Sequence, residues 1–356
     1  MHKRTNLASD NYAPVHPRVL EALARVNEGP EPAYGADSET ERLQQTVQQM
    51  FGKKAKAFPV FNGTAANVLS LQSALPSWGA VICLESAHLN LDEGGAPEKV
   101  AGIKIWYVQN SRGDGKLSPE MVKPELKDVG FVHRAQQSAL SITNSTEYGT
   151  VYQPQEVAEL AKLAKANNLV MHLDGARLAN AASALGTSFA SFTSEAGVDV
   201  ISMGGTKIGG MIAEAVVVMD SESEVGSRIA HAMPFLRKTD MQLSSKMRYV
   251  SAQLNALYES GLALELAQQA NQMATLLHER VSEVASKTDK VVLNLDSPAN
   301  AVFPIMDRAV AQKLRETWSF YDWDESIGQV RLMCSWNTTS DEIARFEKDL
   351  REACGI

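Results

Sequence analysis

The middle of the chain alternates between short apolar runs and helix-forming segments, and this alternation constrains the fold most strongly. The helix-forming segments are predicted over residues 62–75 and 153–168. The apolar runs are predicted as strands at residues 56–61, 80–84, 103–108, 138–142, 169–174, 198–203 and 213–220. Strands that are apolar along their whole length are buried on both faces, which is typical of a mostly parallel sheet flanked by helices. An α/β protein with a mostly parallel sheet is therefore expected.

The two ends of the chain have a different pattern. Helices are predicted over residues 17–27 and 38–51, and a long helical region over residues 241–286. Further strands and helices follow, with strands at 291–295, 300–305 and 329–336 and a last helix from residue 340. We expect a large domain at residues 17–245 and a smaller α+β domain formed by residues 1–16 and 246–356.

Composition excludes several classes of protein. The formal net charge of −8 over 356 residues argues against a general binder of nucleic acid or of anionic membranes. No apolar run is long enough to span a bilayer, and the first residues lack the apolar core of a secretory signal. The three cysteines, Cys83, Cys334 and Cys354, have no metal-ligand spacing, and they fit a reduced, cytoplasmic setting best.

Polar residues directly after two predicted strands are candidate site residues, because open parallel sheets bind ligands beyond the carboxyl ends of their strands. Gly63 and Thr64 in "FNGTAAN" open a helix, where free N–H groups suit a phosphate; the alternative is an ordinary helix cap. His88 in "SAHLNLDEGG" could stack on a flat ligand or transfer a proton near neutral pH. The alternative for His88 is a loop histidine with satisfied hydrogen bonds.

Charged residues follow two later strands. Asp174 ends "LVMHLD", where it could cap a helix or pair with a cofactor nitrogen, and Arg177 follows in the same turn. Lys207 lies in "ISMGGTKIGGM", with two glycines on each side. A lysine in a partly apolar pocket has a lowered pKa and a nucleophilic amine, whereas the alternative is a surface lysine lying along apolar atoms. The glycines favour the first interpretation, because they offer no apolar surface and let a bulky group approach.

A phosphate loop, a flat stacking side chain, an aspartate for a ring nitrogen and a nucleophilic lysine are together the parts of a pyridoxal phosphate (PLP) site. The chain also resembles the PLP-dependent threonine aldolases of fold type I, the aspartate aminotransferase fold, which are grouped with the β-eliminating lyases. The resemblance covers essentially the whole chain, through "ASDNYAPVHPRVLEAL", "YGADSETERLQQTVQQMFGK", "FNGTAANVLSL", "ESAHLNLDEGGAPEK", "HLDGARLANAA", "VISMGGTKIGG" and "VRLMCSWNTT". It implies a large domain with a seven-stranded type of sheet and a smaller C-terminal domain.

The resemblance implies cofactor roles for the residues after the strands. Lys207 would bond to PLP as a Schiff base, and Asp174 would pair with the ring nitrogen. His88 would stack on the ring, Arg177 would lie near the phenolic oxygen, and the Gly63–Thr64 turn would bind the phosphate. No metal ion is expected to be required.

The resemblance also implies substrate contacts. Ser9 and Arg331 would bind the substrate carboxylate, and a guanidinium fork suits that task on chemical grounds too; the alternative for Arg331 is an ion pair at the domain interface. Tyr34 would lie near the site, on a neighbouring subunit of a homo-oligomer. Arg237 and Lys238 would reach a neighbour's phosphate. A homotetramer, a dimer of dimers with shared active sites, is expected.

One segment departs from the family pattern. Many members read Glu-Asn-Thr-His after the strand that follows the stacking histidine, whereas residues 143–146 here read Thr-Asn-Ser-Thr. Thr146 therefore takes the place of a second active-site histidine among the substrate-binding residues. A neutral hydroxyl accepts protons poorly, so the sequence favours His88, directly or through a water, as the acceptor of the substrate's β-hydroxyl proton.

The expected activity is cleavage of L-threonine, L-allo-threonine and related β-hydroxy-α-amino acids to glycine and an aldehyde. Three alternatives stay open: a β-eliminating lyase on serine- or cysteine-type substrates, an aminotransferase, and a non-catalytic PLP-fold binding module. A nucleotide-binding oxidoreductase is disfavoured, because no G-x-G-x-x-G motif follows the first strand.

Overall fold

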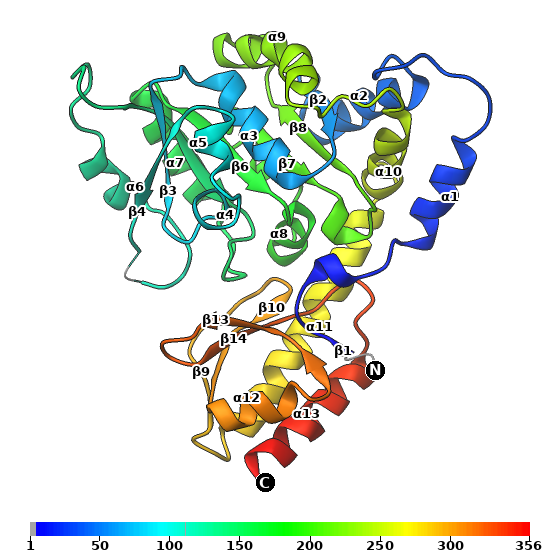
Figure 1. Cartoon of the computed structure of the whole chain (residues 1–356), viewed down its shortest axis with the longest axis vertical. Helices are drawn as coiled ribbons and strands as arrows, with labels where there is room; N and C mark the ends of the chain where they lie inside the picture. Colours follow the sequence, from blue (N-terminus) through cyan, green and yellow to red (C-terminus); the bar gives the residue numbers. More distant parts are fainter. Residues whose placement is uncertain (1–4, 111) are drawn as a thin grey trace.

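A computed structural model describes residues 5–110 and 112–356, and a seven-stranded sheet forms the middle layer of its larger part, in the upper half of Figure 1. The strand order is β2, β8, β7, β6, β5, β3, β4. β8 is antiparallel to β2 and β7, whereas all other neighbours are parallel. The strands are β2 Lys56–Val60, β3 Gly79–Leu84, β4 Lys104–Val108, β5 Gln136–Thr143, β6 Val170–Gly175, β7 Val200–Gly204 and β8 Glu214–Val218. The predicted mostly parallel sheet is confirmed.

Helices cover both faces of this sheet, because alternate strand residues enter different cores. Val81 of β3 packs in the core that includes α3 and α9, whereas the next residue, Ile82, packs in the core that includes α2, α7, α8 and α10. Burying one such aliphatic side chain stabilises the fold by about 1.5–3 kcal/mol. The covering helices are α2 Ser38–Phe51, α3 Gly63–Ala74, α7 Pro154–Ala166, α8 Leu178–Leu185, α9 Glu224–Thr239 and α10 Arg248–Tyr258.

Local sequence fixes where the main helices begin. The side chain of Asp37 accepts a hydrogen bond from the N–H of Thr40 (2.8 Å) at the start of α2, and Asn62 caps α3 in the same way (2.8 Å to the N–H of Ala65). The shorter helices are α1 Pro17–Arg25, α4 His88–Leu91, α5 Ala96–Lys99 and α6 Pro119–Val122, with 3₁₀ turns η1 Asp10–Tyr12, η2 Lys123–Glu125, η3 Ala190–Phe192 and η4 Thr206–Ile208.

A second, antiparallel sheet forms from the C-terminal part of the chain, in the lower half of Figure 1. The N-terminal segment joins this part, because β1 pairs in parallel with β12. Its elements are β1 Thr5–Asn6, β9 Val291–Leu293, β10 Ala301–Val302, β11 Pro304–Met306, α12 Arg308–Leu314, β12 Trp318–Ser319, β13 Tyr321–Asp324, β14 Gln329–Met333 and α13 Ser340–Cys354.

The long helix α11 (Leu262–Ala285) connects the two parts. Its first residues, Leu262 and Leu266, pack in a core of the large sheet, whereas Leu277 and Val281 pack in the core of the C-terminal part. The domain division at residues 17–245 stays a prediction. No helix among the described residues is long and apolar enough to cross a membrane.

The structure differs from the predicted elements at two helices. The helical region predicted over residues 241–286 is two helices, because Gly261 adopts a left-handed conformation (φ 76°) between α10 and α11. The sequence does not indicate α9, since Pro234 inside it ordinarily argues against a helix.

Candidate active site

The carboxyl ends of β5, β6 and β7 meet at one edge of the large sheet, beside a cavity of about 220 Å³. The register places Thr143 of β5 beside Asp174 of β6, and Asp174 beside Ser202 of β7. The cavity brings together most of the predicted site residues. It is lined by Ser9, Asn11, Gly63, Asn67, His88, Asp92, Thr143, Glu147, Asp174, Ala176, Arg177, Lys207, Tyr321, Trp323 and Arg331.

Lys207 lies on η4, directly after β7. Within residues 5–110 and 112–356, its amine has no carboxylate in ion-pair contact and no hydrogen-bond partner. Burial lowers the pKa of the Lys207 amine and the charge of Arg177 lowers it further, against the opposing charges of three nearby carboxylates. A lowered pKa supplies more of the neutral amine, which is the nucleophilic form.

The glycines around Lys207 serve backbone packing. A Cβ on Gly204 would lie 2.6 Å from the carbonyl oxygen of Ala176, and a Cβ on Gly205 would lie 2.6 Å from that of Ala213. From the sequence, we expect these two glycines to leave space for a bulky group. In the structure, they instead allow close contact with neighbouring backbone. They let the turn that carries Lys207 pack directly against neighbouring backbone, and so they fix its position.

Asp174 is buried at the end of β6, and both of its carboxylate oxygens are bonded. Oδ2 accepts a hydrogen bond from Asn67 Nδ2 (2.8 Å), and Oδ1 accepts one from the N–H of Ala176 (2.9 Å). Burial raises the pKa of this carboxyl, but the charge of Lys207 and these hydrogen bonds outweigh it, so the pKa is lowered. Asp174 is thus an ionised carboxylate in a fixed orientation.

A chain of buried hydrogen bonds orients Asn67. Its Nδ2 donates to Asp174 and also to Glu93 Oε1 (2.8 Å), so its Oδ1 accepts the proton of the Ser202 hydroxyl (2.6 Å). The Ser202 oxygen then has no proton left for His172, and it accepts from His172 Nε2 (3.2 Å). Burial lowers the pKa of His172 to about 4, which agrees with a neutral ring protonated on Nε2.

His88 opens α4, and its Nδ1 lies 3.0 Å from Oε1 of the buried Glu93. This hydrogen bond raises the pKa of His88, against the lowering effect of burial, and the charge of Asp174 raises it further. Asn67 therefore connects Asp174 to Glu93, the carboxylate that is hydrogen-bonded to His88.

Glu93→Gln is expected to lower the pKa of His88, because the neutral amide no longer favours the charged ring. The change is measured by NMR titration of histidine ring carbons, with His278 on α11 as the internal control. The folded protein raises the pKa of His88. The stabilisation that protonated His88 gives the fold is therefore complete below pH 6.5, the ordinary pKa, and is lost as the pH rises through the raised pKa. An unchanged His88 titration in the variant would contradict this account.

Arg177 forms a two-point ion pair with Asp10 of the N-terminal segment. Its Nε lies 2.6 Å from Asp10 Oδ2, and its Nη2 lies 3.0 Å from Oδ1. Burial raises the pKa of Asp10, but Arg177 outweighs it, so the pKa is lowered and the pair is charged. The pair ties the N-terminal segment to the loop after β6. The predicted place of Arg177 beside a phenolic oxygen stays a prediction.

Arg331 of β14 and Ser9 of the N-terminal segment reach the cavity from the C-terminal part of the fold. The Arg331 guanidinium lies over the ring of Trp323 (5.1 Å) and that of Tyr321 (5.4 Å), and its Nη2 donates to the carbonyl of Ala8 (3.1 Å). Burial lowers the pKa of Arg331 to about 10, which keeps it charged at neutral pH. Its buried Nε has no partner among the described residues, so part of the fork is free for a carboxylate.

Gly63 lines the cavity at the start of α3, and Thr64 follows in the first helical turn. First-turn N–H groups of a helix carry partial positive charge and suit a phosphate. The phosphate role of Gly63 and Thr64 stays a prediction.

Besides Thr64, four predicted residues do not line the cavity: Thr146, Tyr34, Arg237 and Lys238. Thr146 is 2% exposed, and its hydroxyl bonds to that of Thr150 (2.7 Å). Tyr34 is 52% exposed, with the Lys238 amine 4.8 Å from its ring centre. Arg237 is buried and donates to a backbone carbonyl of β2 (3.0 Å). The predicted substrate contact of Thr146 is therefore not supported, whereas Tyr34 and Lys238 are exposed at the surface.

Sequence reasoning missed other residues at the cavity or directly behind it. Asp10 follows the predicted Ser9, and Glu93 lies five residues after the predicted His88, but neither carries a local signal for its partner. Asn67 is a polar residue in an otherwise buried helix, which is a signal that could have been used. The other lining residues that were not predicted are Asn11, Asp92, Thr143, Glu147, Ala176, Tyr321 and Trp323.

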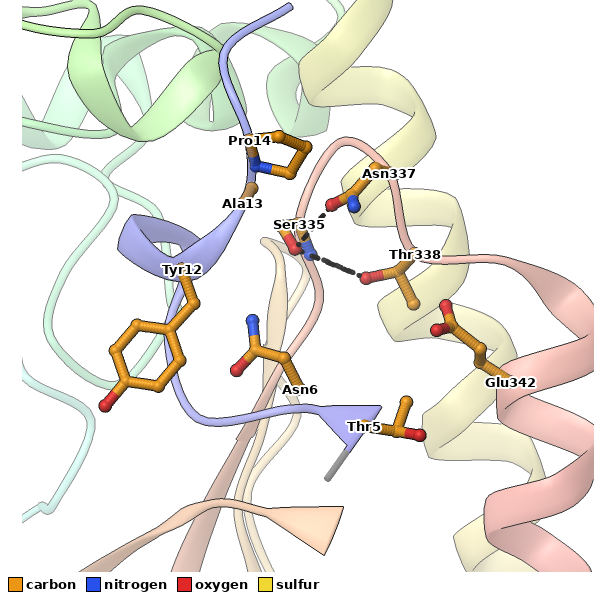
Figure 2. A pocket seen from close by; sticks show the side chains of 9 residues that line it. All are labelled: Thr5, Asn6, Tyr12, Ala13, Pro14, Ser335, Asn337, Thr338 and Glu342. Atoms are coloured by element: carbon orange, nitrogen blue, oxygen red, sulfur yellow. Dashed lines mark hydrogen bonds between the residues drawn. The ribbon is translucent and has the colours of Figure 1, made fainter. Parts of the chain in front are cut away.

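A larger cavity of about 450 Å³ lies between the N-terminal segment and the loop after β14 (Figure 2). Its polar groups bond to one another: the N–H of Ser335 donates to Thr338 Oγ1 (2.9 Å), and Ser335 Oγ donates to Asn337 Oδ1 (3.2 Å). Its carboxylate, Glu342, is held in the capping box of α13. The smaller cavity therefore carries the reactive groups.

The residues of the smaller cavity fit a PLP group. The unpaired, partly buried amine of Lys207 can bond to an aldehyde, and the ionised Asp174 can hold a proton on a ring nitrogen. The start of α3 offers N–H groups, and the ring of His88 borders the same space. Among the described residues, no group of three His, Cys, Asp or Glu side chains is arranged to hold a metal ion.

Comparisons with known proteins show the family and the fold of the chain. A family model described as beta-eliminating lyase matches residues 6–300. The chain is 36% identical to the low specificity L-threonine aldolase of Pseudomonas sp. (strain NCIMB 10558), over 97% of this chain and 96% of that one. It matches the structure of Leishmania major threonine aldolase with a TM-score of 0.89 at 27% identity, covering 98% of each chain. A Thermus thermophilus aspartate aminotransferase mutant matches with a TM-score of 0.72 at 16% identity, over 99% of this chain and 97% of that one, which shows the fold alone.

The fold and the site define a PLP-dependent enzyme of fold type I, the aspartate aminotransferase fold. The chain belongs to the beta-eliminating lyase family and, within it, to the threonine aldolases. The expected family, fold class and cofactor are confirmed.

Proposed function

We propose that this protein is a carbon–carbon lyase of the low-specificity L-threonine aldolase type. It would cleave L-threonine, L-allo-threonine and related β-hydroxy-α-amino acids to glycine and an aldehyde. The observation that carries the proposal is one cavity that holds an unpaired amine, Lys207, an ionised carboxylate, Asp174, and a partly free guanidinium, Arg331. The names of the related aldolases support it.

Bound PLP supplies an electron sink for the pair of electrons released when the Cα–Cβ bond breaks. Arg331 and Ser9 bind the substrate carboxylate, and this contact orients the scissile bond. Asp174 holds the proton of the ring nitrogen, because its carboxylate is ionised and fixed. His88 would pack on the ring, and the amine of Lys207 would return a proton to Cα.

A substrate screen tests this function. Threonine, allo-threonine and phenylserine are supplied to the PLP-loaded enzyme, and glycine and aldehyde are measured beside pyruvate and ammonia. The proposal expects glycine and aldehyde in equal amounts. Release of pyruvate and ammonia from serine or cysteine, without aldehyde formation, would instead indicate a β-eliminating lyase.

We further propose a cytoplasmic homotetramer, built as a dimer of dimers, in which neighbours complete each site. The exposed Tyr34 with Lys238 beside it supports a contact to a neighbour's site. Three buried, unpaired cysteines support a reducing compartment. The Arg237 side chain is already bonded within its own subunit, so Lys238 is the better candidate for a neighbour's phosphate.

A further inference from the structure

Three carboxylates line the active-site cavity, and they differ in what they are free to do. Asp92 is exposed to solvent. Asp174 uses both oxygens for hydrogen bonds from Asn67 and the N–H of Ala176. Glu147 is partly buried and faces the same cavity. Of the three, Glu147 is therefore the carboxylate that is both sheltered and available for proton transfer.

Two hydrogen bonds fix Glu147 in the loop after β5. Its Oε1 accepts from the N–H of His88 (3.0 Å) and from the hydroxyl of Thr143 (2.8 Å). Both bonds end on Oε1, and among residues 5–110 and 112–356 no hydrogen bond ends on Oε2, which leaves that oxygen for a ligand. Burial raises the pKa of Glu147, against the lowering effect of these hydrogen bonds, and a carboxylate with a raised pKa accepts protons better near neutral pH.

We propose that Glu147 accepts the β-hydroxyl proton during aldol cleavage, a role that rests on the proposed aldolase function. The O–H bond of the substrate breaks and an Oε2–H bond forms, while the freed oxygen electrons make the C=O bond of the aldehyde. The electron pair of the Cα–Cβ bond is taken up through the bound cofactor, and Cα then takes a proton to give glycine. Glu147 returns its proton to solvent after the aldehyde leaves, so no oxidant or reductant is needed.

This assignment replaces the acceptor that the sequence favours. The hydrogen bond to Glu93 raises the pKa of His88, so its ring keeps its proton over more of the neutral range and suits donation better than acceptance. Thr146, the residue in place of a second histidine, is buried away from the cavity. Glu147 is the next residue along the chain, and it does reach the cavity.

Glu147→Gln separates proton acceptance from loop structure, because an amide oxygen can still accept from His88 and Thr143 but cannot take a proton. Cleavage of phenylserine and threonine is expected to fall about 10²-fold. Exchange of the glycine Cα hydrogen with solvent deuterium involves no hydroxyl, so it is expected to stay within about twofold of wild type. PLP binding, followed by visible absorbance, is expected not to change. Glu147→Asp keeps a carboxylate and is expected to lose less cleavage.

Glu156→Gln, on α7 after the same strand, is the matched control and is expected to change neither reaction. Wild-type cleavage by Glu147→Gln would overturn the proposal. So would a parallel loss of cleavage and glycine exchange, since that result indicates a purely structural contact to His88. A wild-type enzyme that exchanges glycine but cleaves no β-hydroxy-α-amino acid would overturn the aldolase function, and the role of Glu147 with it.

Discussion

Lys207→Ala is expected to remove the visible absorbance band of the PLP-loaded enzyme and to lower turnover by on the order of 10⁴-fold. The reason is that no other described residue lining the cavity carries an amine. Its remaining cations, Arg177 and Arg331, are guanidinium groups that stay protonated and are poor nucleophiles. Absorbance after dialysis against PLP measures cofactor attachment, and glycine release measures turnover.

Lys116→Ala is the matched control for this experiment. Lys116 is also largely buried, but its amine pairs with Glu156 (2.6 Å) outside the cavity. This variant is expected to keep the absorbance band and turnover. Should Lys207→Ala show the colour and rate of wild type, the assignment of the reactive amine is wrong.

The strand ends of the large sheet could be predicted from sequence, because an apolar run followed by a polar residue is a local pattern. Asp174 and Lys207 both end or follow such runs, and the parallel sheet brings them to one edge. The family resemblance predicted two further site residues, Ser9 in the N-terminal segment and Arg331 in the C-terminal sheet. The structure brings both to the same cavity as Lys207.

The partners of these residues could not be predicted in this way, because they depend on contacts between distant segments. Asp10 meets Arg177 only when the N-terminal segment folds over the loop after β6. Asn67 meets Asp174 because α3 packs on one face of the sheet, with Asn67 near its start. No periodicity in the sequence encodes either pairing. The aromatic residues of β13 belong to a strand that the pattern does not indicate, since it is short and largely polar.

The segment after β5 shows how comparison by position can mislead. Position by position, Thr146 replaces a histidine and is expected to contact the substrate. In the structure the backbone turns so that Thr146 bonds to Thr150 inside the protein, while Thr143 and Glu147 face the cavity. Under the proposal for Glu147, the group that accepts the proton would lie one residue later than the family pattern predicts.

Asp174→Asn is expected to weaken PLP retention and to lower turnover by about 10²- to 10³-fold, as for the loss of one fixed electrostatic contact at a reacting group. A neutral amide cannot stabilise the positive charge of a protonated ring nitrogen. The new side chain also has one acceptor oxygen for two buried donors, Asn67 Nδ2 and the N–H of Ala176, and leaving one unpaired costs about 1–3 kcal/mol. Equilibrium dialysis of PLP, turnover and thermal unfolding measure these three effects.

Asp199→Asn is the control for the loss of a partly buried, hydrogen-bonded carboxylate away from the active-site cavity. Asp199 precedes β7 at the opposite end of the strands, where its Oδ2 accepts from the N–H of Met171 (2.8 Å). This variant is expected to lose some stability and to keep PLP affinity and turnover. If the Asp174 variant and the Asp199 variant give the same PLP retention, turnover and thermal unfolding, Asp174 contributes only to the stability of the fold. If PLP retention and turnover fall in the Asp174 variant alone, the carboxylate acts on the ring nitrogen, because both variants replace a hydrogen-bonded carboxylate with an amide and only Asp174 lines the cavity.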